Sequence, residues 1–221
     1  YLSSGYCTIK TGKEQGEGGK EQKEDGVRLQ IAVFYAMMCG KKELNSMPVT
    51  PAFFSFLVEN RLHDSKAWFE AHREDYNRFV LEPLRGLVQE MAPVMLTLDP
   101  LLITQPAVGK TISRIFRDTR FSRDKSAFRE HLWISFSRGK AERYQPVPEL
   151  YFDLSPDGYS YGCGWYCPGT QLMETLRRLI LEGDKTALAA VRAAERQNHF
   201  QMEGEEYKRK KHPDAPAALQ P

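Results

Sequence analysis

The stretch from residue 149 to residue 166 constrains the fold more than any other part of the chain. Apolar residues alternate with other residues on both sides of the interruption Ser155-Pro156-Asp157-Gly158. This interruption is typical of a type I turn, with proline at the second position and glycine at the fourth. Because successive side chains of a strand point to opposite faces of a sheet, the pattern predicts a β-hairpin over residues 149–166. The alternating residues are Leu150, Phe152, Leu154, Tyr159, Tyr161, Cys163 and Trp165.

A shorter alternation upstream predicts a further strand. Its apolar members are Leu132, Ile134 and Phe136. The residues between and around them are His131, Trp133, Ser135 and Ser137. Since the period is again two, we expect one face of this strand to be buried and the other to be polar.

The segments before these strands carry helical spacing. Thr50-Pro51 is an N-cap residue followed by proline at the first helical position, and it predicts a helix up to Asn60. Asp64-Ser65 predicts the start of a second, longer helix. Pro83 marks a boundary or a kink, after which the helical pattern resumes.

Two more helices are predicted after the hairpin. Thr170 is the expected cap of the first, which ends at Gly183, and Asp184 is the expected cap of the second. Helices, then strands, then helices indicate an α+β domain with a central antiparallel sheet, rather than alternating βαβ units.

Residues 1–46 differ from the rest of the chain. Thr11–Gly26 consists almost entirely of Gly, Lys, Glu and Gln, a composition that cannot bury enough surface to order itself. We expect residues 1–46 to be a low-complexity or disordered extension that is not a native part of the domain. A targeting or partner-binding arm is the alternative. The patterned domain starts at Met47.

Composition excludes several classes of protein. The formal net charge is +2, so the chain is not a bulk polycation. No apolar run reaches the roughly 18 residues of a membrane span, so we expect no membrane partner and take the cytoplasm as the default location. The four cysteines are too few for a disulfide scaffold, and they are expected to be reduced thiols: Cys7, Cys39, Cys163 and Cys167.

Positive charge is concentrated in one stretch. Residues 109–145 hold ten basic and four acidic side chains, whereas residues 47–108 and 146–200 are both net acidic. Arginine offers a planar fork of donors that matches phosphate or carboxylate. The centre of the stretch therefore predicts an anion-binding site, formed by Arg114, Arg117, Arg120, Arg123 and Lys125, with Asp118 and Asp124 in support.

The alternative is an Arg–Asp lattice that braces a loop and binds no ligand. If Asp118 and Asp124 each neutralise one cation, three of the five basic groups still need partners or water. Both interpretations remain open at the level of the sequence.

Residues 114–129, RIFRDTRFSRDKSAFR, resemble the RD-x-RF-S-x-DK-x-P-Y-K motif of the domain of unknown function 2461 family. Further similarity lies in FFSFL at 53–57, AWFEAHREDY at 67–76, PELYFDLSPDGYSYGCGWYCP at 148–168 and YKR at 207–209. The resemblance implies a compact α+β domain over residues 47–209. It implies no established activity, substrate or cofactor.

The chain departs from the family pattern in two places. Ala127, Phe128 and Arg129 stand where the family usually has Pro, Tyr and Lys, so a tyrosyl hydroxyl is missing while the charge is kept. The family also continues into further helix where this chain has residues 210–221, and we expect that tail to be truncated.

No catalytic residue, cofactor or metal site is predicted. The histidines His63, His72, His131, His199 and His212 lack metal-ligand spacing, and His72 is expected to pack beside Trp68. No Gly-x-Ser-x-Gly elbow is present. Gly162-x-Gly164 lacks the remaining features of a phosphate loop. Whether the protein is an enzyme, and its oligomeric state, stay open.

Three functions follow from these observations. The first is binding of a phosphate- or carboxylate-bearing ligand by Arg117, Arg120 and Lys125, supported by Arg114 and Arg123. The second is nucleic-acid binding by the same stretch, with stacking on Phe116, Phe121 and Phe128. A pI of 8.3 argues against the second, because basic nucleic-acid domains usually exceed about 9. The third is a scaffold domain with no ligand.

Overall fold

The computed structural model describes residues 8–10, 49–139, 147–166, 168–196 and 201–203. These fall in two compact units. The larger contains residues 49–139 and 150–161, and the smaller contains the rest. Apart from residues 8–10, the predicted extension over 1–46 lies outside the described residues, as does the tail from residue 204 onward.

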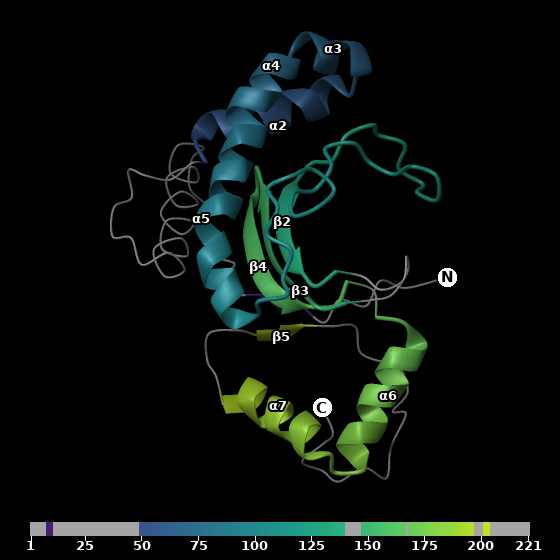
Figure 1. Cartoon of the computed structure of the whole chain (residues 1–221). Coiled ribbons are helices and arrows are strands. Elements are labelled where there is room, and N and C mark those ends of the chain that lie inside the picture. Colours follow the sequence, from purple (N-terminus) through teal and green to yellow (C-terminus); the bar gives the residue numbers. More distant parts are fainter. Residues whose placement is uncertain (1–7, 11–48, 140–146, 167, 197–200, 204–221) are drawn as a thin grey trace, which may run out of the picture. The chain divides into compact units, whose positions relative to one another are not determined.

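Helices precede the three-stranded sheet, most of which lies in the larger unit, and helices and sheet together make an α+β fold, as predicted (Figure 1). The elements are α2 (Pro51–His63), α3 (Lys66–Ala71), α4 (Arg73–Tyr76), the π-helical turn η2 (Asn77–Leu81), α5 (Glu82–Leu98), β2 (Leu132–Ser137), β3 (Glu149–Ser155) and β4 (Gly158–Gly164).

The predicted first helix is α2, which starts at Pro51 and continues to His63, past the expected end at Asn60. It ends because Asp64 adopts a left-handed conformation, with φ of 40°. Ser65 then caps α3, since its hydroxyl accepts a hydrogen bond from the Trp68 amide at 3.4 Å. The longer helix predicted from Asp64-Ser65 is thus divided into α3, α4 and η2.

Pro83 marks a boundary, as predicted: η2 ends at Leu81 and α5 begins at Glu82. Proline has no N–H and cannot donate to the carbonyl one turn earlier. A π-helical turn directly before it is consistent with that missing hydrogen bond, because such widened turns interrupt the regular pairing.

The predicted hairpin is β3 and β4, and the strand order in the sheet is β2-β3-β4. Gly158 has φ of 153°, a conformation that other residues rarely adopt, and its carbonyl accepts a hydrogen bond from the Ser155 hydroxyl at 3.0 Å. Residues 111–113 pair with β2: the Ser113 amide donates to Trp133 O at 2.9 Å, and the Ser135 amide donates to Thr111 O at 2.8 Å.

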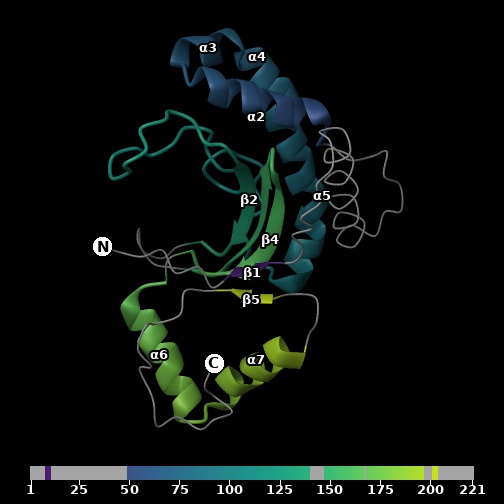
Figure 2. The ribbon, with the colours of Figure 1, turned by 180° about the vertical axis from the view of Figure 1, so that it is seen from behind.

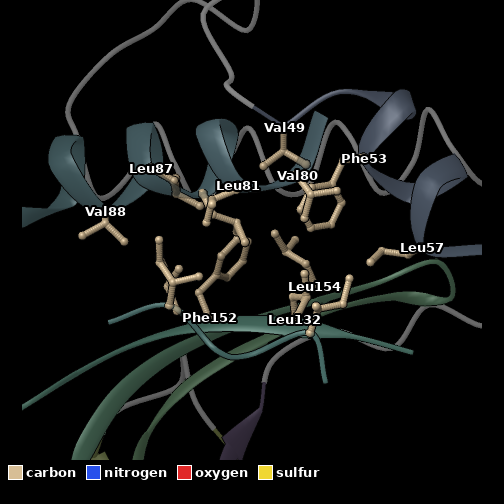
Figure 3. Packing of buried hydrophobic residues seen from close by; sticks show 14 of the residues in the cluster. Val49, Phe53, Leu57, Val80, Leu81, Leu87, Val88, Leu132, Phe152 and Leu154 are labelled. Atoms are coloured by element: carbon tan, nitrogen blue, oxygen red, sulfur yellow. The ribbon is translucent and has the colours of Figure 1, made fainter. Parts of the chain in front are cut away.

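The core lies between α5 and one face of the sheet (Figure 3). Leu87 and Val88 of α5 point toward Phe152, Leu132 and Leu154 of the strands. Part of the chain between α5 and β2 pairs with β2, since the Ile103 amide also donates to Ser137 O at 2.9 Å, and the rest of this connection is the long loop that Figure 2 shows from behind. The β2-β3-β4 sheet therefore has one face that packs against α5 and a second, opposite face.

The smaller unit contains α6 (Thr170–Leu181), α7 (Lys185–Arg196) and the paired strands β1 (Thr8–Lys10) and β5 (Gln201–Glu203). Asp184 caps α7 as predicted, since its carboxylate accepts from the Ala187 amide at 2.8 Å. Thr170 was expected to cap α6, but it is the first helical residue and Gly169 occupies the cap position.

Within the described ranges, no helix is both long enough and apolar enough to cross a lipid bilayer.

Candidate functional site

The basic segment is a loop whose two ends pair with each other. The Arg117 amide donates to Ala127 O at 2.9 Å, and the Arg129 amide donates to Ile115 O at 2.8 Å. Phe116 and Phe128 stand opposite each other in this antiparallel bridge. Residues 118–126 therefore form the distal part of a closed loop, and the residues on either side of them form its base.

Aromatic packing fixes the base. The ring centroids of Phe69, Phe116 and Phe128 lie 5.1–5.3 Å from one another. Phe128 is only 2% exposed, so the phenylalanine that replaces the usual family tyrosine is a core residue here. The Asp64 carboxylate also accepts a hydrogen bond from the Ala127 amide at 2.8 Å, which links the end of α2 to the loop.

The first of the two aspartates, Asp118, binds Arg120 through both carboxylate oxygens. Arg120 Nε lies 3.0 Å from Oδ1 and its Nη2 lies 2.7 Å from Oδ2. The Arg120 side chain, followed by its backbone amide, donates hydrogen bonds that lower the pKa of Asp118 to about 2, with the charge of Arg129 adding to the effect. The pair is well exposed, since 76% of the Arg120 side chain is accessible.

Asp124 holds the other side of the loop. Its carboxylate lies 2.5 Å from Arg117 Nη1, and it accepts hydrogen bonds from the Ser126 hydroxyl at 2.6 Å and the Ser126 amide at 2.9 Å. The hydrogen bonds from Ser126, and then the charges of Arg117 and Arg61, lower the pKa of Asp124. Both aspartates therefore brace the loop, as the lattice interpretation expects.

The remaining cations divide into two kinds. Lys125 Nζ donates to Thr119 O at 2.8 Å and so closes the loop on itself. Arg114 lies at the base, with its guanidinium 3.6 Å from the position that a Cβ on Gly109 would take. Arg114 and Arg123 are both exposed and have no carboxylate partner among the described residues. Three of the five predicted cations are thus held inside the loop and two are left over.

The three phenylalanines considered for stacking also differ. Phe128 is buried, so the expectation that it is available to a nucleobase is wrong. Phe116 is packed against Phe69 and Phe128. Phe121 is 96% exposed, with the Arg120 guanidinium 5.8 Å from its ring centroid.

A second polar group, which the sequence analysis did not select, lies on the sheet face opposite α5. His131 Nδ1 and Asp153 Oδ2 are 2.6 Å apart, joining β3 to the residue just before β2. The His131 ring stacks on Trp133 at 5.3 Å, and Arg129 Cζ lies 4.7 Å from the centre of the same indole. The period-two pattern could have found this group, because it places His131, Trp133 and Asp153 opposite the buried residues of their strands.

The expected packing of His72 is confirmed: its ring stacks on Trp68 at 4.0 Å and its Nδ1 lies 2.8 Å from Trp68 O. In the part of the chain that the structure describes, no three His, Cys, Asp or Glu side chains are grouped as a metal site would require. Cys167, His199 and His212 lie outside that part.

Together, the fold and the loop define an α+β domain with an arginine-rich loop braced by two aspartates. Residues 52–219 match the model of the family described as "Conserved hypothetical protein (DUF2461)", and the chain belongs to this family. The resemblance seen in the 114–129 motif is therefore confirmed. No curated protein and no solved structure matches the chain.

Proposed function

We propose that the domain binds a phosphate- or carboxylate-bearing ligand on the loop of residues 114–129. The observation that carries the proposal is the charge left over after the internal pairs are formed. Arg114 and Arg123 remain exposed without a carboxylate partner in the described ranges. A guanidinium fork recognises phosphate or carboxylate through two parallel hydrogen bonds.

The internal pairs differ in how readily they can yield to a ligand. The Arg120–Asp118 pair is exposed, and exposed pairs contribute only about 0–1 kcal/mol, so an incoming anion can compete for Arg120. Arg117 is less exposed and is shared between Asp124 and Ser126. We therefore assign binding to Arg114, Arg120 and Arg123, with Lys125 as an exchangeable donor and Arg117 as the brace.

The test is a calorimetric titration with inorganic phosphate and with citrate at low ionic strength. The double variant Arg114→Gln plus Arg123→Gln is expected to weaken binding at least tenfold, because each charge-assisted hydrogen bond contributes about 1.5–3 kcal/mol. Its melting temperature should match that of the parent chain. Arg85→Gln, on α5, breaks an exposed pair with Glu82 and is the control for loss of a positive charge.

Unchanged binding in the double variant, or no binding of either probe to the parent chain, would overturn the proposal and leave the lattice as a structural brace only. Loss of binding in Arg85→Gln to the same degree would show that general charge, and not the loop, attracts the anion.

The second candidate function, nucleic-acid binding, is favoured by one observation, the exposure of Phe121 next to Arg120. Base stacking on an aromatic ring is worth about 1–3 kcal/mol. If single-stranded nucleic acid is the ligand, Phe121→Ala should weaken binding of an oligonucleotide, and affinity should fall steeply with salt. If neither Phe121→Ala nor added salt changes the affinity for the oligonucleotide, this candidate function is excluded.

A further inference from the structure

The guanidinium of Arg114 lies beside the backbone of Gly109. A Cβ added to Gly109 would lie 3.6 Å from Nε and 3.6 Å from Nη2 of Arg114. Apart from the adjoining positions of the chain, no other atom of the described residues comes within 4 Å of this Cβ position. The space that a side chain at Gly109 would fill is therefore bordered by two donor atoms of Arg114.

The distances also show which part of the guanidinium faces Gly109. Cζ of Arg114 is farther than 4 Å from the Cβ position, although both nitrogens bonded to it lie at 3.6 Å. A point above the flat face of a guanidinium would be about as close to Cζ as to the two nitrogens. The Cβ position therefore lies near the plane of the group, in front of the edge from which Nε and Nη2 donate.

The same edge of another arginine shows how an anion binds there. Arg120 holds the carboxylate of Asp118 through Nε at 3.0 Å and through Nη2 at 2.7 Å. Carboxylate and phosphate groups both accept two parallel hydrogen bonds of this kind. If an oxyanion bound Arg114 in the same way, its oxygens would occupy much of the space in which a Cβ of Gly109 would stand.

The donor edge of Arg114 is available to such an anion. Arg114 and Gly109 are both exposed. In the part of the chain that the structure describes, the Arg114 side chain has no hydrogen-bond or ion-pair partner, whereas Arg117 and Arg120 each hold an aspartate. An anion can therefore bind Arg114 without displacing an internal pair.

The backbone next to this edge is fixed by hydrogen bonds. The Gly109 amide donates to Ile112 O at 2.8 Å. The Ser113 amide, directly before Arg114, donates to Trp133 O of β2 at 2.9 Å. Gly109 and the backbone of Arg114 thus belong to one turn that is anchored on the sheet, which favours binding because little has to be ordered when a ligand arrives.

From this geometry we infer where the anion of the proposed function binds: side-on at the Nε and Nη2 edge of Arg114, in the space left open because Gly109 has no side chain. The inference rests on the proposed function and adds Gly109 as the residue that admits the ligand. The Gly109 amide already donates to Ile112 O, so Gly109 contributes space and not a hydrogen bond. The ligand is a phosphate or carboxylate group, and no covalent bond forms or breaks.

The test is Gly109→Ala in a titration with inorganic phosphate at low ionic strength. An alanine Cβ would make an ordinary van der Waals contact with unliganded Arg114 at 3.6 Å, but it would exclude the oxygens of a side-on anion. We expect the dissociation constant for phosphate to rise about tenfold or more, as the loss of a charge-assisted hydrogen bond requires. Arg114→Gln should raise the dissociation constant to a similar extent.

Gly183→Ala is the matched control. Gly109 and Gly183 both have φ of 78°, so alanine introduces the same kind of backbone strain at either position. Among the described residues, nothing lies within 4 Å of the position that a Cβ on Gly183 would take. Gly183→Ala should therefore leave the affinity for phosphate unchanged.

The NMR signal of the Arg114 Nε–Hε group gives a second readout, and it is assigned by its loss in Arg114→Gln. Phosphate should shift this signal saturably in the parent chain and in Gly183→Ala, but not in Gly109→Ala. If Gly109→Ala fails to fold, Gly109→Asn replaces it, because asparagine tolerates a positive φ better than most side chains do.

If Gly109→Ala binds phosphate with the affinity of the parent chain while Arg114→Gln does not, the inference is overturned and the proposed function stands. The anion would then reach Arg114 from another side. Equal weakening in Gly183→Ala would also overturn the inference, because backbone strain and not the lost space would be the cause. A parent chain that binds no phosphate would overturn the proposed function, and the inference with it.

Discussion

The two faces of the β2-β3-β4 sheet are built from the same strands, but their side chains differ in how deeply they are buried. On the α5 side, Leu132, Ile134 and Phe136 are buried completely or almost completely. On the other side, Trp133 and Ser135 are only partly buried. Burial of apolar area stabilises the fold by about 25 cal/mol per Å², so the first face dominates stability. The second face is free to carry charge, a histidine and a carboxylate.

The largest expected effect is on the helix-covered face. Phe152 is almost fully buried, and Phe152→Ala should lower the free energy of unfolding by about 3–5 kcal/mol, because it removes apolar contacts and leaves a cavity. Ser135→Ala, on the opposite face of β2, is the matched control and should change it by less than about 0.5 kcal/mol. Urea denaturation measures both. Equal losses would mean that the two faces are not distinct in the way described.

An intermediate effect is expected at the loop, where charge and not burial sets the behaviour. The Asp118 carboxyl should titrate near its pKa of about 2 in the folded chain, against an ordinary value of 3.8. Since the folded pKa is lowered, the associated stability is present above about pH 4 and is lost as pH falls toward 2. Arg120→Ala removes the main cause and should return the pKa toward its ordinary value. Carboxyl carbon NMR during an acid titration tests this, and an unchanged Asp118 midpoint in the variant would contradict the pairing.

The smallest expected effect is at the end of the same loop. Phe121 is 96% exposed, so Phe121→Ala should change the melting temperature by no more than the measurement error. Surface substitutions of this kind change the free energy of unfolding by less than about 0.5 kcal/mol. Phe128→Ala, at the base, should lower it clearly, because Phe128 packs against Phe69 and Phe116. A clear loss of stability in Phe121→Ala would mean that Phe121 packs against the protein in solution.

Much of the fold could be predicted because its local rules are strong. The turn at Pro156-Asp157 and the alternation around it define β3 and β4, and Pro51, Pro83 and Asp184 mark helix boundaries that the structure confirms. One exception is Asp64-Ser65, where one long helix was expected. Its division into α3, α4 and η2 depends on how the segment packs, which a periodic pattern does not contain.

The partners of the basic residues could not be predicted in the same way. Arg117 is held by Asp124, seven residues later, while Arg120 turns back to Asp118. Which aspartate each arginine takes depends on the closure of the loop by Phe116 and Phe128, and spacing alone does not define that closure. The pair formed by His131 and Asp153 depends on the register between β2 and β3, which the alternation within each strand does not define.

The left-handed conformation of Asp64 has a consequence for motion. The same residue terminates α2 and holds the Ala127 amide, 63 positions further along the chain. The last turn of α2 and the base of the arginine loop are therefore both held by this one residue. When the end of α2 frays, the Ala127 amide loses its hydrogen bond to Asp64. The Ala127 amide hydrogen should therefore exchange with deuterium at the same rate as the amides of the last turn of α2.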